Sequence, residues 1–217
     1  MLLQNKDIMN LNRTYRINLI NSITGAKPAN LVGTRSADNV DNVAIFSSVV
    51  HIGSHPPYLG FFIRPQTFKS TDTYQNISLN KYFTINSVEE NTFLESHLTS
   101  KKFERNESEF KYCSIDKTSI NNFQAPFVKN SKIKIGLKLV QKKKILNDCT
   151  LIIGQVELLK VDNCYLDEYG RVHIDKMNIV SITGADTYNK LNKIETLPYV
   201  NSTFNIKDKL SEKKSTI

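Results

Sequence analysis

The chain has no tryptophan, only three cysteines and no long uninterrupted hydrophobic run. No segment approaches the roughly 20 consecutive apolar residues that a membrane-spanning helix needs. The first 20 residues lack the apolar stretch and small-residue cleavage site of a signal peptide. We therefore expect a cytoplasmic protein without a membrane segment.

Motifs for metals and nucleotides are also absent. Cys113, Cys149 and Cys164 are widely separated and form no Cys-x-x-Cys pair, so neither a zinc site nor a disulfide framework is indicated. His51 and His55 have no third ligand nearby, and we interpret them as strand and turn residues. Without a Gly-x-Gly-x-x-Gly motif, a Rossmann dinucleotide site is not predicted.

Acidic residues are fewer than basic ones: the chain has 21 Asp+Glu and 29 Lys+Arg, which gives a net charge of +8. Clustered cations supply affinity for nucleic-acid phosphates, so a basic nucleic-acid-binding barrel is one hypothesis. However, the pattern predicts a hairpin turn at Lys142–Lys144, and the last lysines belong to a polar tail. Solvated charge is the favoured interpretation, and nucleic-acid binding is a remote alternative.

The segment 30–65 predicts a β-meander, because Val, Ile and Phe alternate with polar residues between turn signals. Ser47 and Ser48 interrupt its second strand, and on a pleated sheet one of them must face each side. Either the inward serine bonds a neighbouring carbonyl, or the strand presents a small polar surface to a ligand. The expected strands are Ala29–Thr34, Val43–Val50 and Tyr58–Ile63, with a turn at Ser36–Asp41.

Shorter elements are expected on both sides of this meander. Tyr15–Ile23 is either a strand or a short helix. A helix is predicted at Thr73–Asn80 with Asp72 as its cap, then a strand at Tyr82–Val88 and a helical stretch from Glu89 to His97. The charged segment Thr99–Glu109 is predicted to leave the barrel, and such loops often carry binding residues.

Two long strands are predicted at Ser131–Val140 and Thr150–Val161. Gly136 and Gly154 lie inside them, where glycine usually marks a bulge or a bend that closes a barrel. A last short helix is expected to reach Leu197. The composition of 217 residues with 40% hydrophobic content suits one compact domain.

Several motifs follow one another in an order that resembles the flavin reductase family. They are Gly33-Thr34-Arg35, Asp41-Asn42-Val43-Ala44, Phe46-Ser47-Ser48, Pro56-Pro57, Arg64-Pro65, Asp72-Thr73-Tyr74-Gln75-Asn76-Ile77, Tyr82-Phe83-Thr84-Ile85-Asn86, Lys102-Phe103 and Ala125-Pro126-Phe127. The resemblance covers roughly Asn21 to Tyr199. It implies a mainly β fold, an FMN-binding split barrel with short helices, at residues 21–200. An N-terminal extension of residues 1–20 and a polar, flexible tail of residues 201–217 would flank it.

FMN would require two kinds of contact. Its phosphate needs cations and hydroxyl or backbone donors, which a helix N-terminus can provide. We predict the phosphate site at the start of the helix after residue 72, from Arg64, Lys69, Ser70, Thr71 and Thr73. Without a phosphate, Asp72 or Thr73 would simply cap that helix and Arg64 would pair with a surface carboxylate.

The resemblance adds further candidates. It implies Lys102 as another cation for the phosphate, contributed by a second subunit of a homodimer. For the isoalloxazine ring it implies Thr34, Asn42, Ala44, Ser47 and Ser48, with backbone amides as important as side chains.

The implied function is an NAD(P)H-dependent flavin reductase, in which a nicotinamide passes hydride to noncovalently bound FMN. This chemistry belongs mainly to the cofactor and requires no catalytic side chain. A partner monooxygenase or another acceptor would use the reduced flavin. The alternative is a flavoredoxin-like FMN electron carrier without reductase turnover of its own.

Overall fold

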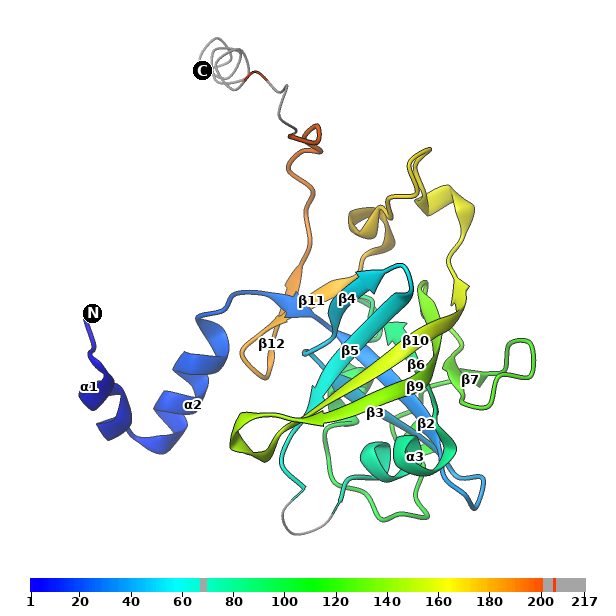
Figure 1. Ribbon diagram of the computed structural model, residues 1–217, viewed down its shortest axis with the longest axis horizontal. Coiled ribbons are helices and arrows are strands. Elements are labelled where there is room, and N and C mark those ends of the chain that lie inside the picture. Colours follow the sequence, from blue (N-terminus) through cyan, green and yellow to red (C-terminus); the bar gives the residue numbers. More distant parts are fainter. Residues whose placement is uncertain (67–69, 201–204, 206–217) are drawn as a thin grey trace.

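The computed structural model describes residues 1–66, 70–200 and 205. Figure 1 shows a curled sheet with short helices packed around it and a pair of helices that projects from one side. The expected mainly β fold with short helices is confirmed. None of the helices within these described residues is long and apolar enough to cross a bilayer.

Seven strands form the main sheet, in the spatial order β3-β2-β6-β9-β10-β5-β4, and each neighbouring pair is antiparallel. β3 and β4 occupy opposite edges, although only residues 47–49 separate them in the chain. Such a short segment spans at most about 14 Å, so the two edges must lie close together and the sheet must curl. This geometry fits the expected split barrel. The bounds are β2 Asn30–Arg35, β3 Asp41–Phe46, β4 Val50–Ser54, β5 Pro57–Ile63, β6 Tyr82–Ser87, β9 Lys134–Lys144 and β10 Thr150–Lys160.

Two smaller sheets and several short helices accompany the main sheet. One small sheet has the order β1-β11-β12 and another pairs β7 with β8. Their strands are β1 Lys27–Pro28, β7 Lys117–Thr118, β8 Phe127–Val128, β11 Val180–Thr183 and β12 Thr187–Lys190. The helices next to the barrel are α3 Asp72–Asn80, α4 Phe93–Leu98 and α5 Glu109–Tyr112, and the 3-10 turns are η1 Leu146–Asp148, η2 Asn163–Tyr165 and η3 Ile174–Met177.

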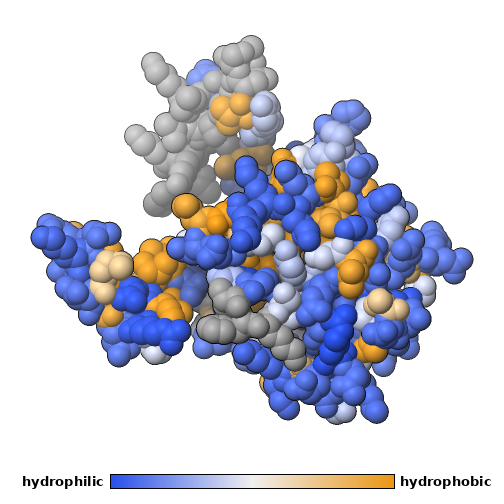
Figure 2. Space-filling model, turned by 60° about the horizontal axis from the view of Figure 1, so that its bottom comes forward, coloured by the Kyte–Doolittle hydropathy of each residue, from blue (hydrophilic) through white to orange (hydrophobic). Residues whose placement is uncertain are grey.

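The projecting helices are α1 (Asn5–Asn10) and α2 (Arg13–Ser22), and neither contains a buried residue. Of the two alternatives expected at Tyr15–Ile23, a strand or a short helix, the structure shows the helix. Asn12 caps α2 by accepting from the amides of the second and third helical residues. In Figure 2 these helices, at the left, show apolar atoms among hydrophilic ones.

Two hydrophobic clusters stabilise the barrel. In the first, the ring of Phe61 makes edge contacts with Phe46 at 4.8 Å and Phe83 at 5.6 Å, and Ile77 of α3 is buried with them. The second packs Val43 of β3 against residues of α5 and β11. Because α3 and α5 join different clusters, each helix is fixed against the sheet by its own apolar contacts.

The expected single strand Val43–Val50 is wrong, because the structure divides it into β3 and β4 at the serine pair. Ser48 bonds both backbone groups of Phe62: its Oγ accepts from the amide and donates to the carbonyl, each at 3.1 Å. The serine pair is therefore the point where the chain crosses from one sheet edge to the other.

The hairpin turn expected at Lys142–Lys144 is also wrong. These lysines belong to β9 and pair with the start of β10. The chain reverses later, where Asn147 and Asp148 adopt positive φ values of 57° and 56°. Asn and Asp tolerate this left-handed conformation better than lysine does, which explains the position of the turn.

Glycines bend the two long strands as expected. The register of β9 and β10 shifts between Ile153 and Gly154, and again between Val156 and Leu158, which pairs with Gly136. A Cβ at residue 154 would lie 2.6 Å from an atom of the Phe83 ring, so only glycine leaves room for that core side chain.

The helix expected before Leu197 is absent: within the described residues, the C-terminal segment forms β12 and then continues without regular structure from 191 to 200. β12 pairs with β11 from Thr187 to Lys190. The β-branched residues of β11, Val180, Ile182 and Thr183, favour this hairpin over a helix. The predicted tail lies outside the described residues, except for residue 205.

Candidate functional site

The first turn of α3 is built by its own N-terminal residues. Thr71 is the N-cap, and its hydroxyl accepts from the Tyr74 amide at 3.4 Å. The amide and hydroxyl of Thr71 both donate to Gln66 Oε1, at 2.7 and 3.2 Å. The expected cap, Asp72, is instead the first helical residue. The prediction was wrong by one position, since Thr and Asp are both good caps and stand side by side.

Polar side chains from β2, β3 and α3 meet beneath this first turn. Thr34, Asn42, Thr73 and Asn76 are all nearly fully buried. The hydroxyls of Thr34 and Thr73 each lie 3.3 Å from Asn42 Oδ1, to which they donate. Asn76 Nδ2 donates to Thr34 Oγ1 at 3.1 Å, whereas Asn76 Oδ1 has no partner within the described part of the chain. These bonds fix the N-terminal half of α3 on the sheet.

Glu109, the first residue of α5, extends this network to the outer edge of β3. Its Oε2 accepts from Asn42 Nδ2 at 2.7 Å and from the Val43 amide at 3.2 Å. Burial raises the pKa of Glu109, and the bonds from Asn42 and Val43 oppose that rise. The Ile45 amide donates to Thr99 Oγ1 at 3.0 Å in the same way. Side chains of the 99–109 segment therefore satisfy two amides of an edge strand. We call Thr34, Asn42, Thr73, Asn76 and Glu109 the site network.

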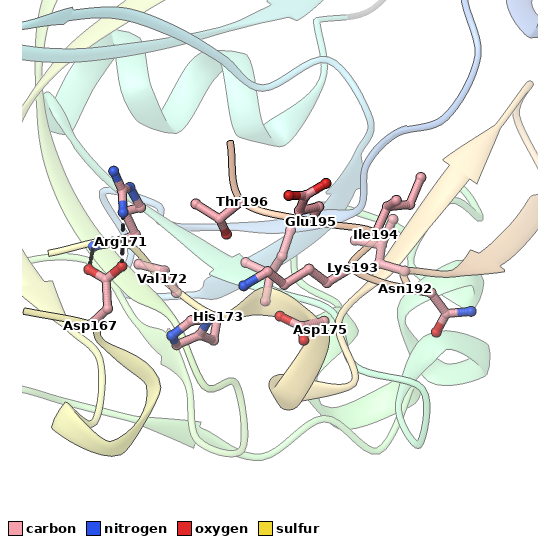
Figure 3. Close-up of a pocket in the computed structure, with 12 residues that line it drawn as sticks. Asp167, Arg171, Val172, His173, Asp175, Asn192, Lys193, Ile194, Glu195 and Thr196 are labelled. Atoms are coloured by element: carbon pink, nitrogen blue, oxygen red, sulfur yellow. Dashed lines mark hydrogen bonds and ion pairs between the residues drawn. The ribbon is translucent and has the colours of Figure 1, made fainter. Parts of the chain in front are cut away.

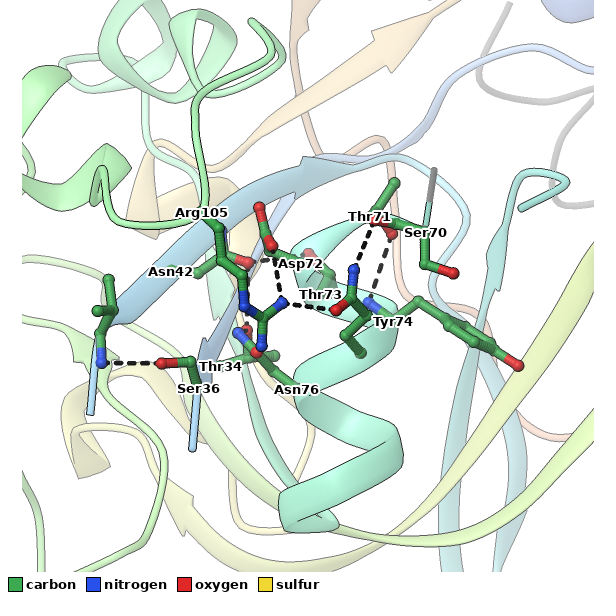
Figure 4. A network of polar contacts seen from close by, with 12 residues as sticks. Thr34, Ser36, Asn42, Ser70, Thr71, Asp72, Thr73, Tyr74, Asn76 and Arg105 are labelled. Atoms are coloured by element: carbon green, nitrogen blue, oxygen red, sulfur yellow. Dashed lines mark hydrogen bonds and ion pairs between the residues drawn. The ribbon is translucent and has the colours of Figure 1, made fainter. Parts of the chain in front are cut away.

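Arg105 reaches from the same segment to the first turn of α3 (Figure 4). Its Nη1 donates to Asp72 Oδ1 at 3.2 Å and to Gln75 Oε1 at 2.6 Å. Gln75 in turn donates from Nε2 to the Ser70 carbonyl at 2.8 Å. A half-buried guanidinium is thus held beside the residues expected to meet a phosphate.

Asp41 of β3 holds two cations through its carboxylate and bonds the 99–109 segment through its carbonyl. The buried Asp41 carboxylate accepts from Arg35 Nε at 2.7 Å and from Lys117 Nζ at 2.6 Å. The hydroxyl of Ser108 donates to the Asp41 carbonyl. The segment is therefore a fixed part of the site.

The remaining phosphate candidates lie around the helix start in different ways. Ser70 and Thr71 are at the N-terminus of α3, and Arg64 lies exposed just beyond the end of β5. Lys102 is exposed on the 99–109 segment and forms no ion pair with any described residue. Lys69 lies outside the described residues.

The ring candidates divide into two groups. Thr34 and Asn42 use their polar atoms within the site network. Ala44 and Ser47 are half-buried at the end of β3, and the Ser48 hydroxyl is engaged by Phe62. Any contact that a ring made here through Thr34, Asn42 or Ser48 would compete with bonds inside the protein. Backbone groups are therefore the more suitable donors.

The donor set at α3 fits the phosphate of FMN. A nine-residue helix presents its N-terminus there, with two hydroxyl residues, Ser70 and Thr71, directly before it. The guanidinium of Arg105 lies against its first turn. Hydroxyls, first-turn amides and a guanidinium are the groups that bind phosphate oxygens.

The sequence did not single out Asn76, Glu109 or Arg105 as site residues, although Asn76 lies within one of the motifs that carry the resemblance. Arg105 and Glu109 do lie in the segment that was expected to carry binding residues. However, Arg105 meets Asp72 across 33 positions and Glu109 meets Asn42 across 67. No local pattern marks pairs so far apart, and Asn76 lies in a helix that shows no unusual composition.

Two neighbouring pockets in the described part of the chain lie away from this site. The larger, about 320 Å³, is formed where residues 191–196 run past Asp167 and the 171–175 loop (Figure 3). It contains none of the predicted site residues. A neighbouring apolar pocket of about 190 Å³ shares Ile174 and Leu191 with it. No group of three His, Cys, Asp or Glu side chains among the described residues could hold a metal ion.

Comparison with known proteins agrees with the fold and with the resemblance. Residues 24–177 match the family model of the flavin reductase like domain. The match includes the main sheet, α3, α5 and the 99–109 segment.

Solved structures show the same architecture. An inferred flavin reductase with a split barrel domain from Shewanella frigidimarina is 33% identical, with a TM-score of 0.88 over 92% of this chain and 100% of that one. Flavoredoxin of Desulfovibrio vulgaris is 25% identical, with a TM-score of 0.68 over 82% and 92%. Nitrilotriacetate monooxygenase component B from Bacillus cereus is 21% identical, with a TM-score of 0.79 over 91% and 98%, and shows the same fold.

Proposed function

The chain belongs to the flavin reductase like domain family, and from this premise we propose that it is an NAD(P)H-dependent flavin reductase that binds FMN noncovalently. The observation that carries the proposal is the donor set at the start of α3, in a chain matched by the family model from residue 24 to 177. When bound, the flavin supplies the redox chemistry, since it can accept a hydride from a nicotinamide.

The residues of this chain would hold and orient the cofactor. Ser70 and the first-turn amides of α3 would bind the phosphate, with Arg64 as an exposed cation nearby. Thr71 would join them by exchanging the bond from its hydroxyl to Gln66 for one to the phosphate. The end of β3 would meet the ring through its backbone and through Ala44 and Ser47. The site network would keep these two parts at a fixed distance, because it bonds α3 directly to β2 and β3.

We also propose a homodimer, with Lys102 of one copy directed to the phosphate of the other. Its exposure without an ion pair in the described chain supports a role towards a second molecule. One structural relative is named as component B of a monooxygenase. The acceptor in this proposal is a partner monooxygenase that consumes the reduced flavin.

A flavoredoxin-like electron carrier is the second candidate function. The likeness to a flavoredoxin at 25% identity favours it, because that protein shares the fold over most of both chains. Such a carrier would bind FMN tightly and would not oxidise NAD(P)H by itself.

The visible absorption spectrum of the desalted protein is the first test, with FMN added if the protein is colourless. We expect a flavin band that remains after desalting, followed by oxidation of NADH or NADPH with FMN present. A flavin band without NAD(P)H oxidation would favour the electron carrier. No band and no binding of micromolar FMN would overturn both functions.

A further inference from the structure

An acidic side chain stands where the proposed site must accept an anion. Asp72 is the first residue of α3, and a carboxylate there is favoured by the partial positive charge of the helix N-terminus. The same carboxylate would repel a phosphate, which carries nearly two negative charges at neutral pH. A phosphate site at this turn therefore requires a cation that offsets Asp72.

Arg105 lies where its positive charge can offset the negative charge of the Asp72 carboxylate. Its Nη1 bonds both Asp72 and Gln75, and both acceptors lie on the first turn of α3. Among the described residues the guanidinium makes its contacts through Nη1 alone, so Nε and Nη2 form no hydrogen bond there. Arginine has five donors in a planar fork, and two fixed bonds at one nitrogen orient the others.

We propose that Arg105 supplies the fixed positive charge of the phosphate site, held in position by Asp72 and Gln75. The inference rests on the proposed function, since it names a residue of the same flavin site. Neither the sequence motifs nor the resemblance pointed to this arginine.

Another arginine pair in the chain shows what a purely local role looks like. Arg171 bonds Asp167 at 3.4 Å, and Asp167 also accepts from the amides of Tyr169 and Arg171. That pair closes a loop of five residues. The Arg105 pair instead joins two segments 33 positions apart, at the place where Ser70 and Thr71 end the preceding loop.

The test compares the affinities of the full-length protein for FMN and riboflavin, which differ by the phosphate. Fluorescence titration would be carried out on the wild type, on Arg105→Gln and on the matched control Arg171→Gln. We expect Arg105→Gln to weaken FMN binding about tenfold or more and riboflavin binding less than about twofold, because only FMN carries the charge. Arg171→Gln should change neither affinity.

A double variant measures the repulsion between the Asp72 carboxylate and the FMN phosphate. Adding Asp72→Asn to Arg105→Gln removes the carboxylate that has lost its cation, so part of the FMN affinity should return. Salt gives an independent readout: FMN binding by the wild type should weaken more steeply with ionic strength than binding by Arg105→Gln. If Arg105→Gln does not fold, Arg105→Lys serves in its place, with a smaller loss of FMN affinity expected.

The outcomes separate this inference from the proposed function. If the wild type binds no flavin, the function itself fails. If the wild type binds FMN and Arg105→Gln binds it equally well, or loses FMN and riboflavin alike, the charge role of Arg105 is overturned. Absence of recovery in the double variant would overturn the offset of Asp72.

Discussion

Two buried carboxylates in this barrel have similar surroundings but different consequences. Glu109 is 7% exposed and Glu89 is 3% exposed, and burial raises the pKa of both. Glu109 accepts from Asn42 and the Val43 amide, and so connects α5, β3 and α3. Glu89 accepts from Ser87 Oγ and from the amide of residue 132, and connects the end of β6 to the start of β9.

The difference lies in what each carboxylate holds. Glu89 lies at the barrel end where it forms a β-bridge with Ile179. We call the residues around it the Glu89 cluster: Ser87, Ser131, Lys132 and Lys134. The site network lies under α3, where we propose the phosphate. Both clusters should matter for stability, but only the site network should also affect flavin binding.

Truncation of Glu109 should have the largest effect. Glu109→Ala leaves Asn42 Nδ2 and the Val43 amide buried without an acceptor, so we expect a loss of about 3 kcal/mol in the free energy of unfolding. FMN binding should weaken as well, because Asn42 no longer holds Thr73 in place. Urea denaturation measures the first effect, and flavin titration below the unfolding transition measures the second.

Glu89→Ala is the matched control. It should cost a similar free energy of unfolding, since two donors again lose their acceptor. FMN affinity should stay within about twofold of the wild type, because none of these bonds reaches α3. Equal losses of FMN affinity in both variants would contradict the comparison and would point to a general loosening of the barrel.

These two clusters also show the limit of sequence reasoning. Alternation located most strands, because one face of each is buried and the period is two. Thr34, Asn42 and Thr73 were named as separate contacts to a ring and a phosphate, and the structure brings them together in one network. Neither buried glutamate was recognised, since burial of a charge depends on partners that the fold supplies from distant segments.

Errors at element boundaries had local physical causes. The β9 lysines were predicted to turn because three consecutive charges suggest a solvated loop, yet a two-stranded ribbon that leaves the barrel is also solvated on both faces. Thr71 and Asp72 are both good N-caps, and the choice depended on Gln66 bonding Thr71 from outside the helix.

A third buried carboxylate, Asp41, tests whether solvent-exposed partners reduce the effect of a substitution on stability and on FMN affinity. Asp41 precedes Asn42 but pairs with Arg35 and Lys117, which remain partly exposed to solvent. We expect Asp41→Asn to lower the free energy of unfolding by about 1.5 kcal/mol, since solvent can replace part of what the cations lose. FMN affinity should fall little. Urea denaturation at low and high salt checks the prediction, and a flavin loss as large as that of Glu109→Ala would contradict it.

A single hydroxyl sharpens the comparison further. Thr73→Val removes the bond to Asn42 while keeping the shape of the side chain, so we expect a loss of about 1 kcal/mol in unfolding free energy. FMN binding should weaken. Ser131→Ala is the control: it removes a bond to the Ser87 carbonyl in the Glu89 cluster and should leave FMN affinity unchanged. The same flavin titration for both variants decides the matter.

The smallest expected effect is on pH dependence. Burial raises the folded-state pKa of Glu109 above its value in the unfolded chain, so the folded state binds the proton more tightly. The contribution of this group is therefore fully present below the unfolded pKa and is lost as pH rises through the raised one.

Glu109→Gln removes that titration, so its free energy of unfolding relative to the wild type should rise as the pH is taken from 4 to 7. The effect is small because bonds from Asn42 and Val43 lower the pKa again, although Asp72 adds a further rise. Glu89→Gln should show a change of the same sign, since burial also raises the pKa of Glu89. Urea denaturation at several pH values measures both slopes. A relative free energy of unfolding that stays flat or falls with pH in either variant would contradict the raised pKa of that carboxylate.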